Sequence, residues 1–252
     1  MSTQGWPVRA GLLKIAEGGR ILRPVTPHGL SFAPRRFGNE NMKHSFKTFV
    51  CAGLAAALCF ALSGCGGDDD GFDYGDNDPN LVVCLGDSLT QGYHCVGAPY
   101  PTRLAQMSGK TVLNYGVAGA HSEYGASIVG SALSRRPGTV CIMFGSNDVV
   151  HGRDMTATKA NLRAIVTAAK ANGSKVVLAV PPRMSYSHAK FDHRVGYLAE
   201  HIRALAKEEG VKLVDLYKAF GEEPERYLNP EDGLHLSDEG GEFVAKKFNS
   251  RI

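Results

Sequence analysis

Short apolar runs alternate with longer segments of helical periodicity over the carboxy-terminal part of the chain. An apolar run of four to eight residues between turn residues is typical of a strand buried on both faces. Strands that alternate with helices form parallel sheets through right-handed crossovers, so the pattern predicts an α/β domain. Five such runs predict its strands, at residues 81–85, 111–115, 139–144, 175–180 and 211–216.

Three segments between and after these runs have the period of amphipathic helices. Residues 191–209 end before Gly210, a favoured C-cap residue, and residues 237–248 start at Ser237, a favoured N-cap residue. Residues 156–171 carry one apolar stripe, made of Leu162, Ile165, Val166 and Ala169. The stretch 81–252 is long enough to form one domain with its own core.

The segment before this domain predicts export. A basic segment at residues 42–47 is followed by an apolar run at 49–62 and by small residues up to Cys65. This order is the pattern of a secretory signal, and the run is shorter than the ~20 residues of a membrane-spanning helix. The ending resembles a bacterial lipobox, which implies a lipoprotein signal peptide at 42–64 and a lipidated, amino-terminal Cys65 in the mature chain.

The signal would divide the rest of the amino-terminal region. Residues 1–41 lie upstream of a signal that should come first, so we expect a start codon assigned too early, with a disordered extension as the alternative. Residues 65–80 contain six aspartates and few apolar side chains, which predicts a solvated tether. Gly66, where an inner-membrane retention aspartate often stands, favours a lipid anchor in the outer membrane, on the periplasmic side of the cell envelope.

Processing would also change charge and cysteine content. Residues 1–64 hold eight Lys or Arg and two Asp or Glu, so their removal turns the net charge of +3 into about −3. A basic footprint for nucleic acid is then absent, and we expect no such partner. We expect a monomer held at the membrane by Cys65. The remaining cysteines, Cys84, Cys95 and Cys141, leave the pairing open.

Candidate chemistry begins directly after the first predicted strand, at Gly86-Asp87-Ser88-Leu89. Open α/β sheets bind their ligands at the carboxyl ends of their strands. A serine hydroxyl becomes a nucleophile when a histidine takes its proton and a carboxylate orients that histidine. The loop between the last strand and the last helix supplies both, at Asp232 and His235.

Two other strand ends offer donors for an oxyanion. The second strand is followed by a glycine-rich loop around Gly119, and the third by Gly145-Ser146-Asn147-Asp148. Backbone N–H groups and amide side chains are the groups that stabilise the oxyanion of acyl transfer. Their position at successive strand ends predicts a common site with Ser88.

Together these four blocks resemble the SGNH (GDSL-type) hydrolase family, in the family's order and over the whole predicted domain. The resemblance implies a flavodoxin-like three-layer α/β/α sandwich with a five-stranded parallel sheet. It implies Ser88 as nucleophile, His235 as general base and acid, and Asp232 as its orienting carboxylate. The implied oxyanion hole consists of the backbone N–H groups of Ser88 and Gly119 and the side-chain amide of Asn147. Leu236 departs from the proline that often follows the family's histidine.

The resemblance implies no cofactor and no metal, and the remaining histidines lack ligand spacing. It implies a carboxylic ester or thioester substrate. Short connections favour an open pocket and short acyl groups, and an envelope location favours a small-molecule or glycan ester, such as an acetylated polysaccharide. The alternatives are a lysophospholipase or thioesterase for longer chains, acyl transfer to an alcohol, and an inactive lipid-tethered binding protein. Candidate pocket residues are Tyr93, His94, Tyr100, His151 and Arg183.

Overall fold

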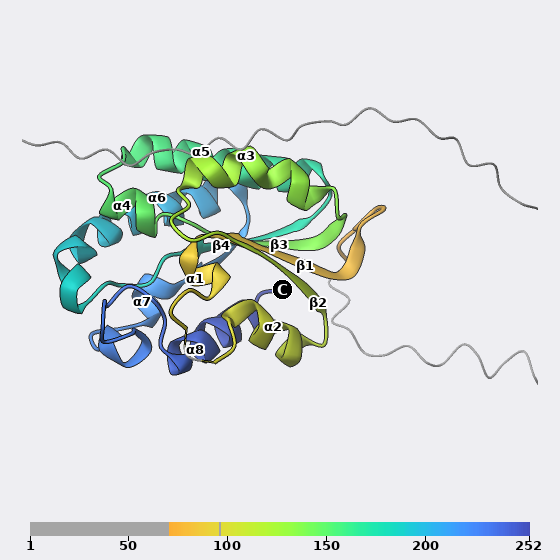
Figure 1. The fold of residues 1–252 in the computed structure, drawn as a ribbon. Helices are drawn as coiled ribbons and strands as arrows, with labels where there is room; N and C mark the ends of the chain where they lie inside the picture. Colours follow the sequence, from red (N-terminus) through yellow and green to blue (C-terminus); the bar gives the residue numbers. More distant parts are fainter. Residues whose placement is uncertain (1–70, 96) are drawn as a thin grey trace, which may run out of the picture. The chain divides into compact units, whose positions relative to one another are not determined.

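The computed structural model describes residues 71–95 and 97–252. Its centre is a parallel sheet of five strands in the order β2-β1-β3-β4-β5 (Figure 1). This is the strand order of flavodoxin-like sheets, and it confirms the predicted fold class. The strands are β1 (Asp78–Gly86), β2 (Thr111–Gly116), β3 (Pro137–Met143), β4 (Lys175–Val180) and β5 (Lys212–Asp215).

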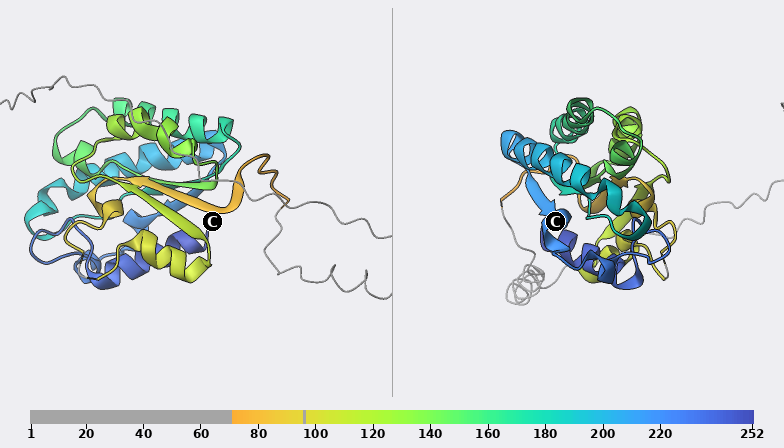
Figure 2. Two further views of the ribbon diagram at one scale, coloured as in Figure 1. Left: turned by 45° about the vertical axis from the view of Figure 1, so that its right-hand side comes forward. Right: turned by 90° about the vertical axis from the view of Figure 1, so that its left-hand side faces the viewer.

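Helices cover both faces of this sheet, because successive side chains of a strand point to opposite faces. Val83 and Leu85 of β1 pack into the core under α3 (Ser122–Leu133), α5 (Met155–Ala171) and α6 (Asp192–Glu209). Val82 and Cys84 of β1 pack into the opposite core, under α2 (Tyr100–Ser108), α7 (Leu216–Ala219) and α8 (Asp238–Asn249). Figure 2 shows the two helical layers on opposite sides of the sheet from two further directions.

The predicted helices occur, with small shifts at their ends. Helix α5 starts one residue before the predicted segment, and α6 is preceded by the 3-10 helix η1 (Tyr186–Phe191). Ser237 caps α8 as expected, since its hydroxyl accepts a hydrogen bond from the backbone N–H of Gly240. The pattern did not predict α2 and α3, or the short elements α1 (Ser88–Gln91), α4 (Ser146–Val150), α7 and η2 (Pro224–Tyr227).

Strand β1 begins three residues earlier than the apolar run indicated. The N–H of Asp78 donates to the carbonyl of Arg136 at 2.9 Å, and the buried Asn77 side chain donates to the carbonyl of Asn172 at 2.6 Å. These contacts attach residues 77–80, which the sequence predicts as the end of the tether, to the sheet and to the end of α5. The upstream extension 1–41, the signal 42–64, Cys65 and tether residues 66–70 lie outside the described residues.

Two further observations concern the cysteines and membrane insertion. Cys84 and Cys141 are opposite each other on β1 and β3, as buried free thiols. Within residues 71–95 and 97–252, none of the helices combines the length and the hydropathy that a membrane span requires.

Candidate active site

Ser88 lies where β1 turns into α1, at the carboxyl edge of the sheet (Figure 1). The turn is tight, since a Cβ at Gly86 would approach the Thr90 hydroxyl to 1.9 Å and the Met143 carbonyl to 2.7 Å. The Asp87 carboxyl then caps α1 by accepting from the N–H of Leu89 at 3.0 Å. A glycine and a capping aspartate therefore fix the start of α1, and Ser88 is 5% exposed there.

His235 and Asp232 come from the loop that precedes α8, and they line up behind Ser88. His235 Nε2 is 3.0 Å from Ser88 Oγ, and His235 Nδ1 is 2.6 Å from Asp232 Oδ2. When Nδ1–H donates to Asp232, the lone pair on Nε2 faces the Ser88 hydroxyl. The arrangement can deprotonate that hydroxyl, and it joins residues 147 positions apart in the sequence.

The Asp232 carboxylate is fixed by three hydrogen bonds. Its Oδ1 accepts from the backbone N–H groups of Leu234 and His235 at 2.8 and 2.9 Å, which leaves Oδ2 for the His235 ring. Burial opposes ionisation, but these three hydrogen bonds outweigh it and lower the pKa of Asp232 to about 2. Asp232 is therefore an anion at neutral pH, as a partner for a protonated histidine must be.

The loop that carries this pair is held mostly by its own backbone. The N–H of Asn229 donates to the carbonyl of His235, and the N–H of Gly233 to the carbonyl of Asn229, each at 2.7 Å. Leu228 and Leu236 form an isolated antiparallel bridge. These bonds close residues 228–236 into a compact turn.

A second set of bonds attaches this turn to the segment after β4. The Gly233 carbonyl accepts from the N–H of Ser185 at 2.9 Å. The Asp232 carbonyl accepts from the Ser187 hydroxyl at 2.8 Å and from His188 Nδ1 at 2.7 Å. Sequence analysis did not identify His188, because its partner lies 44 residues away and shares no motif with it.

Of the predicted oxyanion residues besides Ser88, Gly119 lies in the loop after β2 and Asn147 in α4, which follows β3. After β2, the N–H of Val117 donates to the Gly86 carbonyl at 3.1 Å and the N–H of Ala118 to Gln91 Oε1 at 3.0 Å. Asn147 Nδ2 in α4 donates to the Ala120 carbonyl at 3.0 Å. An amide has two N–H donors, and this contact uses one of them. The bonds on both sides of Gly119 hold its loop between α1 and α4.

The Asp148 carboxyl connects α4 to α3 and α5 by hydrogen bonds. The sequence pattern did not predict this role. Its buried carboxyl accepts from the N–H and the hydroxyl of Ser122 at 3.0 and 2.6 Å, and from the Thr158 hydroxyl at 3.1 Å. One side chain in α4 thereby ties the starts of α3 and α5 to the loop of Asn147. The sequence shows an acidic residue next to Asn147, but it does not identify the partners of that residue.

Asp87 is the other buried carboxyl next to the site. It is fully buried, and its Oδ2 has no hydrogen-bond partner among the described residues. Burial is the main cause that raises its pKa from 3.8 to about 7; the hydrogen bond from Leu89 opposes the rise, and the charge of Asp148 adds to it.

Of the candidate pocket residues, Tyr93 and His94 lie beside the His235–Asp232 pair. The Tyr93 ring stacks on His94 at 4.1 Å and meets the His235 ring edge-on at 5.0 Å. Both side chains reach solvent, with Tyr93 48% exposed. His151 lies at the end of α4, where its Nδ1 is 3.0 Å from Nε2 of His121, the N-cap residue of α3. This histidine pair flanks the loops of Gly119 and Asn147.

The structure buries Tyr100, which corrects the prediction for it, and it pairs Arg183 with other side chains and backbone. Tyr100 is 1% exposed, because α2 turns its ring into the core against Phe248 and its hydroxyl pairs with Thr90. The Arg183 guanidinium is engaged by the Asp192 carboxylate at 2.8 Å and the Gly221 carbonyl at 3.1 Å. These contacts anchor the segment after β4.

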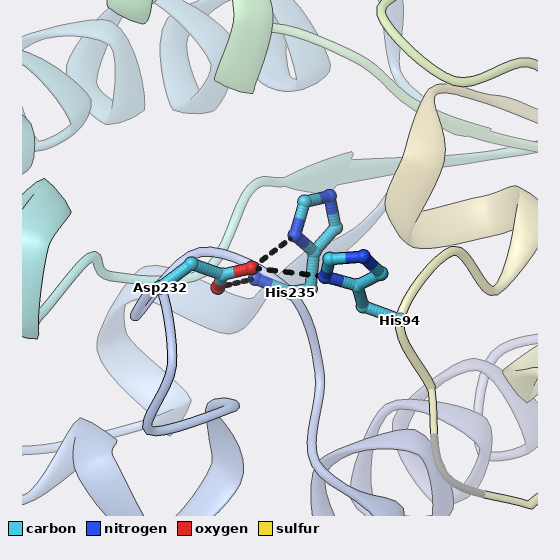
Figure 3. Close-up of side chains that lie close together, drawn as sticks. All are labelled: His94, Asp232 and His235. Atoms are coloured by element: carbon cyan, nitrogen blue, oxygen red, sulfur yellow. Dashed lines mark hydrogen bonds and ion pairs between the residues drawn. The ribbon is translucent and has the colours of Figure 1, made fainter.

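One group in the described part of the chain brings three potential metal ligands together. His94, Asp232 and His235 each offer one ligand atom, and these atoms lie within 4.8 Å of one another (Figure 3). Spacing arguments missed this group because His94 follows α1 whereas the other two precede α8.

Comparisons with known proteins agree with the fold. The model of the GDSL-like lipase/acylhydrolase family matches residues 84–243. A lipase/acylhydrolase from Enterococcus faecalis is similar in structure, with a TM-score of 0.60 and 24% identity over 68% of this chain and 94% of that chain. No curated protein matches the sequence.

Two similar structures are described as esterases. The acetyl xylan esterase AlAXEase superposes with a TM-score of 0.59 and 27% identity, over 68% of this chain and 99% of that chain. A catalytic mutant of Axe2, an acetylxylan esterase from Geobacillus stearothermophilus, gives a TM-score of 0.58 and 21% identity over 69% and 94%.

Proposed function

We propose that this chain cleaves short acyl esters, acetyl esters above all, of carbohydrates or other small alcohols. The chain belongs to the GDSL-like lipase/acylhydrolase family and is a hydrolase acting on esters. The observation that carries the mechanism is the line from Ser88 Oγ through His235 to Asp232, with spacings of 3.0 and 2.6 Å. The substrate class is supported by the aromatic surface beside this line.

In the first half-reaction, Ser88 Oγ attacks the ester carbonyl while His235 Nε2 takes the hydroxyl proton. Asp232 stabilises the imidazolium through Nδ1. The negative charge that forms on the carbonyl oxygen is stabilised by the N–H groups of Ser88 and Gly119 and by the Asn147 amide. The carbon–oxygen bond to the alcohol then breaks, and the alcohol leaves with the proton from His235.

In the second half-reaction, water attacks the acyl-Ser88 ester and His235 takes a proton from that water. The second tetrahedral intermediate uses the same three donors. Its collapse releases the carboxylic acid and returns the proton to Ser88 Oγ. One imidazole carries all the proton transfers, and its Nδ1 is paired with Asp232 throughout.

The exposed Tyr93 ring favours a sugar as the alcohol part. A tyrosine that is stacked on one face and open on the other presents a flat apolar surface with a polar tip. Tyr93 is backed by His94 and lies 5.0 Å from the His235 ring, where the leaving alcohol receives its proton. The resemblance in fold and sequence to AlAXEase is consistent with a sugar acetyl ester.

A substrate series tests this proposal. We expect the purified protein to hydrolyse p-nitrophenyl acetate faster than the butyrate, octanoate and decanoate, and to release acetate from acetylated xylooligosaccharides. Tyr93→Ala should raise KM for the oligosaccharide more than for p-nitrophenyl acetate, because only the sugar uses the ring. A preference for decanoate, or release of fatty acid from lysophosphatidylcholine, would favour the long-chain alternative. Acetyl glycerol formed in the presence of glycerol would indicate acyl transfer.

We also propose that residues 42–64 direct export, that the mature protein starts at a lipidated Cys65 and that it works at the envelope as a membrane-anchored monomer. The support is the basic, apolar and small-residue order of this segment. Mass spectrometry of the protein from its native membrane should find a lipid-modified Cys65. A peptide from residues 1–41 in the mature protein would contradict the assigned start.

A further inference from the structure

Two imidazoles face the same carboxylate oxygen. Besides the His235 contact at 2.6 Å, His94 Nδ1 lies 3.6 Å from Asp232 Oδ2 (Figure 3). The other oxygen of Asp232 is engaged by backbone N–H groups, so Oδ2 is the one turned towards both rings. The three side chains thus converge from two segments, one after α1 and one before α8.

We propose that His94, Asp232 and His235 form a binding site for a divalent transition-metal ion, represented by Zn²⁺, and that occupation of this site inhibits hydrolysis. Two imidazoles and one carboxylate are ligands that zinc takes in proteins. With metal–ligand bonds of about 2 Å, adjacent ligand atoms of a tetrahedral zinc lie ~3.3 Å apart. The 3.6 Å pair already has this spacing, and the 2.6 Å pair has to open by less than ~1 Å.

The surroundings of the site allow an ion to enter. The His94 side chain is 46% exposed, against 18% for Asp232 and 12% for His235, so the open side of the site is the His94 side. Solvent water can complete the tetrahedron from there. His94 has a left-handed backbone, with φ 54°, and its ring is backed by Tyr93, which holds the imidazole over the carboxylate.

Inhibition follows from the proton count of a neutral imidazole. Zinc takes the Nδ1 lone pair of His235, so the single ring proton has to reside on Nε2. Nε2–H is then a donor, and it no longer accepts the proton of Ser88. The ion also replaces the Asp232–His235 hydrogen bond. This inference rests on the proposed role of His235 as general base, whereas binding of the ion does not depend on it.

Zinc titration of the protein, purified without a histidine tag, tests both parts. Calorimetry with ZnCl₂ measures binding, and p-nitrophenyl acetate hydrolysis, scaled to the metal-free rate of each variant, measures inhibition. His94→Asn is the variant of choice because asparagine tolerates the left-handed backbone and lacks an imidazole. Loss of this ligand should weaken both zinc binding and inhibition by about tenfold or more. His151→Asn, which removes an imidazole from the His121 pair, should leave both constants unchanged, and Mg²⁺ should bind to none of these proteins.

The outcomes are distinct. One zinc per chain, inhibition reversed by EDTA and a selective effect of His94→Asn support the site. Equal zinc affinity and equal inhibition in His94→Asn and the parent would overturn it, as would a selective effect of His151→Asn. Zinc binding that depends on His94 but does not reduce hydrolysis would overturn the inhibitory role. A protein without esterase activity contradicts the proposed function, and the binding isotherm still decides whether the ligand set exists.

Discussion

The two halves of the catalytic line are held in different ways. On the nucleophile side, Ser88 and Asn147 directly follow adjacent strands, and buried carboxyls, Asp87 and Asp148, fix the elements around them. On the base side, His235 and Asp232 lie in a turn that follows no strand and is held by backbone hydrogen bonds. The nucleophile side depends on the core of the domain, whereas the base side depends on local geometry at its surface.

This difference implies that the two sides fail differently. A change on the nucleophile side should affect the stability of the whole domain, because its braces join three helices. A change in the polar part of the base turn should reduce catalysis with less effect on stability, since its hydrogen bonds join the turn to itself and to the segment after β4 and do not connect helices. The four predictions below test this separation.

The largest effect is expected for Ser88→Ala, which removes the nucleophile and leaves its braces in place. Turnover of p-nitrophenyl acetate should fall by about 10⁴-fold or more, and the urea midpoint should not change. Ser127→Ala, at an exposed serine of α3, is the matched control and should keep its activity. Retained hydrolysis in Ser88→Ala would refute the assigned nucleophile.

Gly233→Ala should displace the turn that carries His235 and reduce the rate, without affecting the nucleophile side. At φ 69°, a Cβ would lie 2.0 Å from the Ser185 carbonyl oxygen, so the turn has to move and carry His235 with it. A displacement of ~1 Å costs about 10²-fold in rate. The kcat from a stopped assay should show this loss. The urea midpoint should change only a little.

Gly221→Ala is the control for Gly233→Ala. It has φ 68° and nothing within 4 Å of the added Cβ, so it introduces backbone strain without a collision. It should retain most of its activity. Equal losses in the two variants would mean that strain, and not the contact with Ser185, determines the position of His235.

Asp148→Asn should lower the stability of the domain, because it disturbs the hydrogen bonds on the nucleophile side. The amide places a donor where the carboxyl accepts from Ser122 and Thr158, and hydrogen bonds to a buried carboxyl are worth about 1.5–3 kcal/mol. We expect the free energy of unfolding to fall by about 3 kcal/mol in urea. Asp154→Asn, at the N-cap of α5, should change it little because asparagine caps equally well. Unchanged stability in Asp148→Asn would contradict the brace.

The last effect is a change in pH dependence, caused by Asp87, and it is the smallest per pH unit. Its folded-state pKa of about 7 lies above the ordinary 3.8, so the folded protein holds a proton that the unfolded chain releases over this window. Stability should therefore decrease from pH 4 to pH 7, by at most ~1.4 kcal/mol per pH unit. Asp87→Asn should lack this slope when urea curves are compared at several pH values.

Asp232 gives the opposite sign in a separate window. Its pKa, lowered to about 2, stabilises the fold at neutral pH, and this contribution is lost as the pH falls from 4 towards 2. Both the parent and Asp87→Asn should lose it. Identical slopes of the two proteins between pH 4 and 7 would show that Asp87 does not carry the raised pKa.

Sequence patterns predicted the sheet and the residues at its edge because both depend on local signals. Apolar runs identify buried strands, and Ser88 and Asn147 stand directly behind two of them. The Asp-x-x-His spacing of Asp232 and His235 is also local, and the structure brings it to Ser88. The short helices α1 and α4 were not predicted, since four or five residues are too few to show a helical period.

What the sequence could not predict depends on contacts between distant segments. Tyr100 and Arg183 follow strand ends as a pocket residue would, and only the structure shows the packing of α2 that buries Tyr100 and the pairing of Arg183 with Asp192. The Asp148–Ser122 brace and the approach of His94 to Asp232 likewise join separate parts of the chain. Composition and spacing contain no record of such pairs.

The separation of 147 residues between Ser88 and His235 also governs when the enzyme comes into being. A chain that grows from its amino end has its nucleophile with the first strand, yet it has no base until 147 further residues have been made. Every shorter product is chemically silent, however well its sheet has formed. Hydrolysis is therefore a signal that synthesis has passed His235, and a sensitive reporter of the docking of the turn before α8.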